Sequence, residues 1–392
     1  MTGPPASGTV VVSRRGETRV QRGHPWVFRT DVVRDAGVEP GAVVRVEGPQ
    51  GRPLGFAFYS SRSEIRLRVF ERGESLAEGF LGERIDAALR WRETVAPGAA
   101  AFRAVHGEGD GLPALVVDRY GDYLVVQTLS QGMERRKDEV VAALVERLRP
   151  RGVLERNDPK VRRLEGLEAR VGVLHGEVPE TVEVEENGVV FRADLHRGQK
   201  TGLYLDQREN HAAARAYARG RVLDAFSYDG GFALQVAGAA TEVLAVDVSG
   251  EALERVKANA ARNGIGNVAV RDANAFDLLH ELDRDGERFD TVILDPPAFA
   301  KSKDAVEKAW RGYKEINLRA LRLLRPGGIL VTCSCSYHVH EQDFEEILAA
   351  AAVDARAAVT VVEKRRQARD HPIVLGVPET YYLKCFILRK ME

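Results

Sequence analysis

The chain has 392 residues, of which 44% are hydrophobic, and a formal net charge of −1. This length exceeds what a single hydrophobic core usually serves, so we expect two or three domains. No apolar run approaches the roughly 20 residues that span a bilayer, and the first residues, MTGPPASGTV, lack the pattern of a signal peptide. An odd number of cysteines, three, argues against a disulfide framework. We therefore expect a cytoplasmic protein with reduced thiols and no membrane segment.

The near-neutral total charge hides an asymmetry. Residues 1–72 contain 12 Arg and 7 Asp plus Glu, a balance of +5, which leaves −6 for the rest of the chain. A small basic module on a mildly acidic body is one way to bind a polyanion. An ordinary solvated surface would show the same counts, so charge alone leaves both interpretations open.

The first 72 residues are predicted to form a small all-β barrel. Turn signals separate short runs that are β-branched or alternate between apolar and polar residues, at 10–15, 43–48, 54–60 and 64–70. The segment 71–95 then has apolar residues at helical spacing, which predicts a helix.

Residues 73–185 are predicted to form an α+β domain. The segment 111–128 has the pattern of a hairpin with its turn at Tyr-Gly-Asp, 132–149 that of a helix and 152–158 that of a strand. At the end of this region Asn187 and Gly188 form an Asn-Gly dipeptide, which is a strong signal for a tight hairpin turn.

From residue 186 the pattern changes to alternating strands and helices. Apolar strands with helical segments between them are predicted at 221–227, 241–249, 267–275, 289–297 and 327–334. This alternation predicts an α/β fold with a doubly wound parallel sheet that is covered on both faces. The segment 380–390 is predicted to be a late strand that could carry an antiparallel edge.

Such sheets bind ligands beyond the carboxyl ends of their strands. The first strand runs into the turn 224–234, DAFSYDGGFAL, where two glycines let the backbone approach a ligand closely, although the turn does not match G-x-G-x-x-G. Asp247 ends the second strand and is placed to accept the ribose hydroxyl protons of an adenosine-type cofactor. After the third, Asn274 or Asp272 could bind the adenine amino group, and either could equally stabilise the turn.

The fourth and fifth strands end in unusual residues. The fourth ends in Asp-Pro-Pro-Ala-Phe, 295–299, where two prolines stiffen the loop and hold the Asp295 carboxylate in one direction. The fifth ends in Thr-Cys-Ser-Cys-Ser, 332–336, which contains two of the three cysteines. Strands four and five are usually adjacent, so Asp295 and Cys335 should face one cleft. The alternatives are a rigid turn and a pair of small apolar side chains that close a strand.

Taken together, the motifs VLDAFSYDGGFAL, AVDVS, LDPPAF and TCSCS resemble those of the class I S-adenosylmethionine-dependent methyltransferases. The segment 198–210, GQKTGLYLDQREN, resembles one branch, the bacterial cytosine-5 methyltransferases of large-subunit ribosomal RNA that carry an N-terminal PUA domain. RGHPWVF at 22–28 resembles the PUA signature, and VHGEGDGLPALVVDRYGD at 105–122 resembles the middle domain of that family.

The resemblance covers nearly the whole chain and implies its domains, cofactor and partner. The implied domains are a PUA barrel at 1–72, an α+β domain at 73–185 and a Rossmann-like methyltransferase domain at 186–392. The implied partner is large-subunit ribosomal RNA, relatives make a homodimer plausible, and no metal site is implied. The positions that match the binding site for S-adenosylmethionine are Gln207, Arg208, Phe226, Ser227, Tyr228, Gly230, Gly231, Asp247, Val248, Asn274 and Asp295.

The resemblance also implies that Cys335 is a nucleophile and that Asp295 orients the target cytosine. Carbon 5 of cytosine is too weak a nucleophile to attack a methyl sulfonium, and addition of a thiolate at carbon 6 makes carbon 5 enamine-like. Because the two cysteines of this motif are one residue apart on a strand, we expect them to point to opposite faces unless the strand has already ended, with Cys333 on the packed side as a small hydrophobe. The target base must leave its stack to reach the site.

Two other interpretations remain open. Many RNA cytosine-5 methyltransferases carry a second cysteine directly after the strand-four motif, where this chain has Ala298 and Phe299. The DPPAF loop also resembles the loops of methyltransferases that modify exocyclic amines of adenine or guanine, which need no covalent step. A catalytically inert RNA-binding assembly factor with the same fold is the third interpretation.

Within 1–72, the residues Arg22, His24 and Trp26 form a basic and aromatic cluster suited to phosphate contact and base stacking. We predict that this cluster contacts RNA. The alternative for Trp26 and for the neighbouring Phe28 is a place in the barrel core.

Overall fold

A computed structural model describes residues 7–300 and 305–391, and within it the chain forms two compact units. The first unit holds the residues up to Val184, Ala193–Leu205 and Arg369–Thr380. The second holds Glu185–Arg192, Asp206–Ala368 and the residues from Tyr381 onward. Each unit is therefore built from separate stretches of sequence. The division into three domains at 72/73 and 185/186 stays a prediction.

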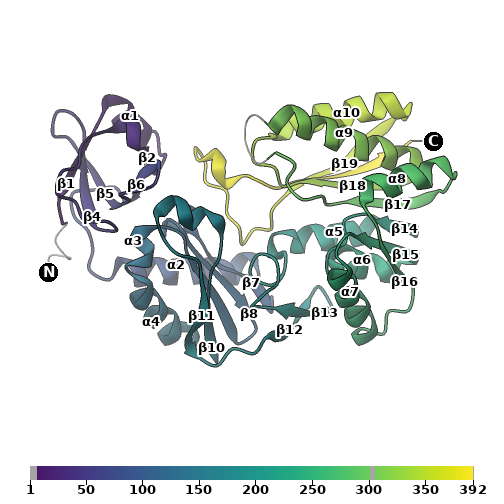
Figure 1. Ribbon diagram of the computed structural model, residues 1–392, viewed down its shortest axis with the longest axis horizontal. Coiled ribbons are helices and arrows are strands. Elements are labelled where there is room, and N and C mark those ends of the chain that lie inside the picture. The colour runs from purple at the N-terminus through teal and green to yellow at the C-terminus, as the bar shows by residue number, and fades with distance from the viewer. Residues whose placement is uncertain (1–6, 301–304, 392) are drawn as a thin grey trace. The chain divides into compact units, whose positions relative to one another are not determined.

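The first unit begins with a six-stranded sheet in the order β2-β6-β5-β4-β1-β3, coloured purple to blue in Figure 1. Its strands are β1 (Thr9–Val12), β2 (Trp26–Phe28), β3 (Val32–Arg34), β4 (Val43–Glu47), β5 (Pro53–Tyr59) and β6 (Ile65–Glu71). Alternate residues of β1 are buried, and Val10 and Val12 join a core of their own with Val44 and Val46. This alternation is the expected pattern of strands with one face on a core.

One helix, α1 (Arg14–Gln21), interrupts this segment, so the prediction that it is all-β is wrong. Residues 13–15, which we assigned to a strand, are the cap and the first turn of that helix. Ser13 is the N-cap, and its hydroxyl accepts a hydrogen bond from the Gly16 N–H at 3.2 Å. A hydroxyl at this position satisfies a donor that the first helical turn cannot pair internally, and the strand therefore ends after Val12.

The rest of the first unit packs helices against a five-stranded sheet in the order β11-β10-β9-β8-β7. Its elements are α2 (Phe80–Val95), β7 (Ala101–His106), β8 (Leu115–Tyr120), β9 (Tyr123–Thr128), α3 (Gln131–Glu134), α4 (Lys137–Leu148), β10 (Gly152–Asn157) and β11 (Arg170–Gly176). The predicted hairpin is confirmed, because β8 and β9 pair antiparallel with Tyr120 opposite Tyr123.

The predicted Asn-Gly turn is also confirmed. It joins β12 (Thr181–Glu186) to β13 (Val189–Asp194), which form a two-stranded sheet. Asn187 has a φ of +51° and Gly188 a φ of +85°. Two successive positive φ values are what a tight hairpin turn requires, and these two residue types adopt them at little cost.

The second unit contains a seven-stranded sheet in the order β16-β15-β14-β17-β18-β20-β19. Its parallel strands are β14 (Gly220–Asp224), β15 (Ala240–Asp247), β16 (Val268–Asp272), β17 (Phe289–Leu294) and β18 (Leu324–Ser334). Helices α5 (Arg208–Tyr217), α6 (Gly231–Val236) and α7 (Gly250–Arg262) cover one face, and α8 (Ala275–Arg284), α9 (Val306–Leu323) and α10 (Glu341–Ala355) cover the other (Figure 1). The predicted doubly wound fold is confirmed, and its strand order reverses between β14 and β17.

The end of the chain differs from the prediction in one respect. The late strand β20 (Lys384–Lys390) is antiparallel to β18, but it lies inside the sheet, and β19 (Val359–Arg366), which we did not predict, forms the edge. The first five residues of β20 are buried, whereas most residues of β19 are partly or fully exposed and several are charged. Charged side chains are typical of a sheet edge because they oppose pairing with a further strand.

Candidate active site

Three aspartates stand at the carboxyl ends of neighbouring parallel strands in the second unit. Asp224 ends β14, Asp247 ends β15 and Asp295 directly follows β17. Because β15, β14 and β17 are adjacent and parallel, these ends meet at one edge of the sheet, beside the point where the strand order reverses. The three carboxyl groups give this edge a negative potential that suits a cationic ligand.

Asp224 is fully buried, and neither carboxylate oxygen has a well-formed hydrogen bond with any residue in the described part of the chain. Burial, together with the charge of Asp295, raises the pKa of Asp224 to about 7. The Ala233 N–H and His211 lower it only in part. We did not single out this residue from the sequence, although it is the first letter of the DAFSYDGGFAL turn. A buried carboxyl group that lacks a well-formed hydrogen bond is a mark of a ligand site.

The turn after β14 is tied to the end of β15 by Asp247. Its carboxylate accepts hydrogen bonds from the Tyr228 N–H and the Ser249 N–H, both at 2.9 Å. Tyr228 has a φ of +48°, which is uncommon for a residue other than glycine. The hydroxyl of Ser227 is buried and lacks a hydrogen-bond partner within residues 7–300 and 305–391. With Asp224, it leaves two buried polar side chains that a ligand could satisfy.

Helix α6 begins at this turn against a buried histidine. Gly230, the N-cap of α6, has a φ of +90°, and a Cβ on Gly231 would lie only 2.7 Å from Cε1 of His211, so a larger residue would clash with the imidazole. His211 is buried, and its Nδ1 lies 2.6 Å from Oε1 of Glu186. Burial acts to lower the pKa of His211, but the pairing with Glu186 outweighs it and the pKa is raised. This pair, which the sequence did not indicate, supports the glycine turn from behind.

The other predicted cofactor residues have varied surroundings. Phe226 packs against the core of the sheet, and Val248 is 67% exposed. Asn274 is the exposed N-cap of α8, and its Oδ1 accepts a hydrogen bond from the Phe276 N–H at 2.9 Å. The turn-stabilising role that we kept open for Asn274 is therefore present in the structure.

Gln207 and Arg208 are buried at the start of α5. The Gln207 Oε1 accepts a hydrogen bond from Nδ2 of Asn210 at 2.6 Å, and the Gln207 side chain also contacts the Cys333 thiol. Arg208 lies 3.9 Å from the carboxylate of Glu209. These contacts place Gln207 beside β18.

Cys335 directly follows β18, is partly buried, and has its Sγ 3.8 Å from the carbonyl oxygen of Pro296. The structure thus brings the loops that carry Asp295 and Cys335 together at adjacent strand ends. Cys333 is fully buried opposite Cys385 of β20, and burial raises the pKa of its thiol well above the ordinary value.

Our reason for expecting Cys333 and Cys335 to point to opposite faces of a strand is wrong. Residues two positions apart on a continuing strand share a face, so alternation would place Cys333 and Cys335 on the same side. Strand β18 ends at Ser334, so Cys335 lies beyond its last residue. The end of the strand is therefore what separates the two thiols.

Two further side chains surround Cys335 that the sequence did not indicate. The Ser336 hydroxyl lies 2.9 Å from the Tyr313 hydroxyl of α9 and accepts a hydrogen bond from the Ala300 N–H at 3.1 Å. On the other side, Nζ of Lys384 donates to the Ser336 carbonyl oxygen at 2.7 Å. Tyr313 and Lys384 come from distant parts of the sequence, and no local motif marks them.

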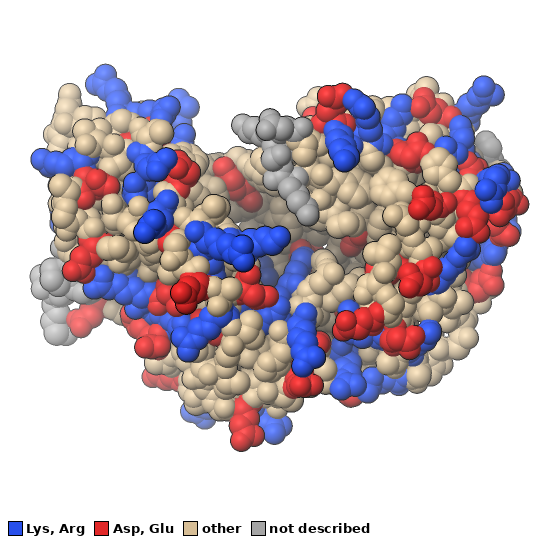
Figure 2. Space-filling model, in the orientation of Figure 1, with Lys and Arg blue, Asp and Glu red and all other residues tan. Residues whose placement is uncertain are grey.

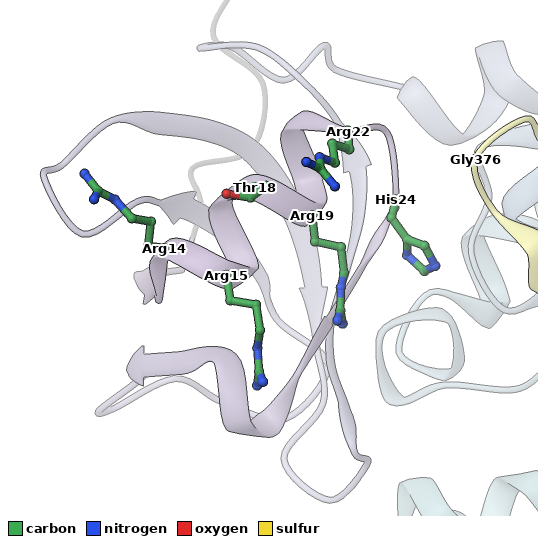
Figure 3. A pocket seen from close by; sticks show the side chains of 7 residues that line it. All are labelled: Arg14, Arg15, Thr18, Arg19, Arg22, His24 and Gly376. Atoms are coloured by element: carbon green, nitrogen blue, oxygen red, sulfur yellow. The ribbon is translucent and has the colours of Figure 1, made fainter.

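A basic groove lies along α1 in the first unit. Its lining residues are Arg14, Arg15, Thr18, Arg19, Arg22, His24 and Gly376 (Figure 3). Arg15 and Arg19 lie 2.5 Å and 3.6 Å from the carboxylate of the buried Asp31. Arg14 and Arg22 are exposed and form no ion pair with any residue that the structure describes. Figure 2 shows further basic side chains on the visible face of this segment, and all of them are Arg because residues 1–72 contain no Lys.

Of the three residues predicted to contact RNA, Arg22 is exposed, whereas His24 and Trp26 are partly buried. The Nε2 of His24 lies 3.1 Å from Oε2 of Glu379, and the indole N–H of Trp26 donates to Oε1 of Glu108 at 2.8 Å. Trp26 is half-buried and already oriented by a carboxylate, which favours the structural alternative for this side chain. The exposed cations of α1 are better placed for a polyanion.

The residues that the structure describes contain no candidate metal site and no candidate membrane-spanning helix. Within residues 7–300 and 305–391, no group of three or more His, Cys, Asp or Glu side chains could hold a metal ion. In the same ranges, each helix is too short or too polar to cross a bilayer. The site is built from carboxylates, a glycine turn and a thiol.

Comparison with known proteins places these features in a family. The family described as S-adenosylmethionine-dependent methyltransferase matches residues 163–386, and the PUA-like domain matches residues 10–72. The ribosomal RNA large subunit methyltransferase I of Aliivibrio fischeri is 41% identical over 97% of this chain and 99% of its own. The protein of the same name from Photobacterium profundum is 43% identical over 94% and 96%.

Solved structures agree on the fold. A SAM-dependent methyltransferase from Streptococcus mutans superposes with a TM-score of 0.83, covers 97% of this chain and 99% of that chain, and is 21% identical. A methyltransferase solved in complex with SAH superposes with a TM-score of 0.84, with the same coverage and identity. At this identity the likeness shows a shared fold that extends over both units of the chain.

Proposed function

The chain belongs to the ribosomal RNA large subunit methyltransferase I family of S-adenosylmethionine-dependent methyltransferases, and from this premise we propose that it methylates carbon 5 of a cytosine in large-subunit ribosomal RNA. The observation that carries the proposal is the position of Cys335. Its thiol stands at the end of β18, with Sγ 3.8 Å from the Pro296 carbonyl of the loop that follows β17. A partly exposed thiol beside a stiff acidic loop suits covalent catalysis on a base.

The buried polar atoms at the switch point fit the cofactor. The bound cofactor supplies a methyl group on a positively charged sulfur. The unpartnered carboxyl group of Asp224 offers a negative group for a cationic ligand, and the buried Ser227 hydroxyl offers a hydrogen-bonding group. We assign the turn at Gly230 and Gly231 to the methionine end and Asp247 to the ribose, with Asn274 near the adenine.

Each bond change in the proposed reaction involves Cys335 or the cytosine. The Cys335 thiolate adds to carbon 6, and the electron pair of the ring double bond moves to carbon 5. Carbon 5 then bonds to the methyl group of the cofactor, while the bond between that methyl group and the cofactor sulfur breaks. A base removes the proton from carbon 5, the ring double bond re-forms, and Cys335 leaves as a thiolate. Asp295 is proposed to accept hydrogen bonds from the cytosine amino group and hold the ring in place.

A second candidate is methylation of an exocyclic amine, and one observation favours it. The three cysteines of the sequence stand at 333, 335 and 385, so no thiol follows the Asp-Pro-Pro motif, where Ala298 and Phe299 stand. In this reaction the amine attacks the methyl group directly, Asp295 accepts its hydrogen bond, and Cys335 has no covalent role.

A trapping experiment distinguishes the two reactions. Wild-type protein is incubated with the cofactor and with ribosomal RNA that carries 5-fluorocytosine, because fluorine cannot leave as the proton does. We expect a covalent adduct that maps to Cys335, the same adduct in Cys333→Ser, and none in Cys335→Ser. Full methyl transfer by Cys335→Ser without an adduct in wild type would reject the covalent reaction in favour of amine methylation.

The 1–72 segment is proposed to capture the RNA through the exposed arginines of α1. Arg14 and Arg22 have no ion-pair partner in the described residues, so they can bind phosphates without breaking an internal contact. Thr18, on the same helix, adds a hydroxyl to this groove (Figure 3). His24 and Trp26 are proposed to shape its border.

A further inference from the structure

Lys384 is a buried lysine next to the proposed nucleophile. It is the first residue of β20, pairs with Ser334 across the β18–β20 ladder, and is 1% exposed. A lysine is seldom buried so completely unless it is paired with an opposite charge. Lys384 makes no ion pair within the described residues, so its charge must have another use or another partner.

The Lys384 ammonium is held by two neutral carbonyl oxygens. Its Nζ donates to the Ser336 carbonyl at 2.7 Å and to the Tyr382 carbonyl at 3.0 Å. An ammonium group has three donors, so these contacts leave one N–H unassigned. The contact with Ser336 fixes the Nζ against the residue that follows Cys335, and so places a positive charge at the base of the nucleophile loop.

The groups that act on this charge come from several elements. Burial lowers the pKa of Lys384 to about 8, and Cys335, Asp343 and Glu341 oppose this effect, with Cys335 the largest of the three. Asp343 and Glu341 belong to α10. From α9, Tyr313 faces the same thiol, and its pKa is raised to about 12 mainly by burial and in small part by Cys335. The Pro296 carbonyl, next to Asp295, borders the thiol on the β17 side.

We propose that Lys384 is a positioning residue whose buried ammonium keeps the Cys335 side chain as a thiolate and holds its loop in place. This proposal rests on the proposed function, in which Cys335 is the nucleophile. The thiol proton passes to solvent, and Lys384 remains protonated and forms no bond to the substrate. The tyrosine and carbonyl groups around the thiol carry no positive charge, whereas the Lys384 ammonium places one beside it.

The test measures the thiolate directly, without RNA or cofactor. Full-length protein is alkylated with iodoacetamide across a series of pH values, and mass spectrometry follows the peptide that contains Cys335. Cys333 and Cys385 are buried and should react slowly. In Lys384→Met we expect the pH midpoint of Cys335 alkylation to rise by about one unit or more, with a rate at pH 7 that is roughly tenfold lower.

Lys390 provides a matched control. It stands at the other end of β20, and its Nζ also donates to two carbonyl oxygens, those of Leu321 at 2.8 Å and Leu324 at 2.7 Å. The two lysines are roughly 20 Å apart, at about 3.4 Å per residue of an antiparallel strand. Lys390→Met should therefore leave the alkylation midpoint of Cys335 unchanged while losing a similar pair of hydrogen bonds.

Two more variants keep the test decisive if Lys384→Met does not fold. Lys384→Arg retains the charge and should keep the low midpoint, whereas Lys384→Gln retains a donor without the charge and should raise it. A folded neutral variant that binds S-adenosylmethionine and alkylates with the wild-type midpoint would overturn the proposal. A shifted midpoint without any 5-fluorocytosine adduct in wild type would instead reject the proposed methylation and leave the Lys384–Cys335 coupling standing.

Discussion

The Sγ of Cys335 lies 3.8 Å from the carbonyl oxygen of Pro296, so the loop after β17 and the end of β18 meet at one edge of the sheet. These two residues are separated by 39 positions in the sequence. Their contact follows from the parallel pairing of β17 with β18, in which Leu294 lies opposite Thr332. This contact is the structural basis for the predictions on the thiol.

Serine substitutions at Cys333 in β18 and at Cys335, which directly follows this strand, should have different effects. Cys335→Ser should reduce methyl transfer to the level of the blank, because a hydroxyl is too weak a nucleophile at neutral pH, and it should retain cofactor binding. Cys333→Ser should retain activity but lose about 1–3 kcal/mol of unfolding free energy, because it places a hydroxyl in a fully buried position that a thiol fills. Chemical denaturation and a labelled methyl-transfer assay measure the two effects. The same loss of activity in both variants would contradict the assignment.

Asp247→Ala should weaken binding of S-adenosylmethionine by about 1.5–3 kcal/mol, the range for hydrogen bonds to a charged group. Part of this loss has a structural origin, since the carboxylate also holds the Tyr228 and Ser249 N–H groups. Asp138→Ala, at the exposed start of α4 in the first unit, is the control and should leave the affinity unchanged. Isothermal calorimetry on folded proteins gives both values, and equal affinities for the two variants would exclude the ribose role of Asp247.

Asp224→Asn should stabilise the protein without its cofactor, and the effect should depend on pH. The folded pKa of about 7 lies above the value of 3.8 for an unperturbed carboxyl, so the folded state keeps a proton that the unfolded state releases. Wild-type stability therefore falls, relative to the variant, as pH rises toward 7, and the gap levels off above that pH at roughly 4 kcal/mol. Denaturation curves over a range from about pH 5.5 to about pH 8.5 measure the gap.

The same variant should also change cofactor affinity, and this effect is unfavourable whereas the effect on stability is favourable. Asp224→Asn should bind the cationic cofactor less tightly than wild type at pH 8, where the wild-type carboxyl is ionised. If the variant is less stable than wild type at high pH and binds the cofactor equally well, Asp224 is not the carboxylate that the bound cofactor satisfies.

Changing Arg14 and Arg22 together to Gln should weaken RNA binding and lower its dependence on salt. Each lost phosphate contact on single-stranded RNA reduces the slope of log affinity against log salt by about 0.7, so the pair should reduce it by about 1.5. Arg52→Gln, in the exposed loop between β4 and β5, is the control and should leave the slope unchanged. Filter binding at several salt concentrations measures the slopes, and equal slopes for all three proteins would remove α1 from the RNA interface.

These point substitutions test the capture role better than removal of residues 1–72. Arg68 donates to the buried carboxylate of Glu165 at 3.0 Å, and the Ser60 hydroxyl donates to the same group at 2.6 Å. Truncation would leave Glu165 buried without these partners, which is strongly destabilising. A loss of RNA binding in the truncated protein would then have two explanations.

The parts of this protein that local chemistry decides could be read from the sequence. Near-continuous apolar runs predicted the parallel strands, and the Asn187-Gly188 dipeptide predicted its hairpin turn because these residues adopt positive φ. The ends of those strands identified Asp247, Asp295 and Cys335 as neighbours, because the carboxyl ends of parallel strands meet at one edge. Helix α1 was missed because its arginine-rich start follows directly on a valine run and only the Ser13 cap marks the change.

Only the tertiary structure determines which polar groups are buried and which groups they contact. Lys384 begins a short strand, and the sequence alone would suggest a solvated charge. Because β19 lies outside β20 in the sheet, Lys384 is instead buried, where it contacts Ser336, a residue 48 positions away in the sequence. Glu186 and His211 are likewise paired only because β12 and α5 pack together, and Asp224 differs from the exposed Asp272 only in standing on a central strand. Burial raises the free energy of an unpaired charge by several kcal/mol, and both the burial and the partners that offset it depend on which elements become neighbours. Strand spacing along the chain therefore predicts where the site lies, whereas the packing order of the strands determines the charge states within it.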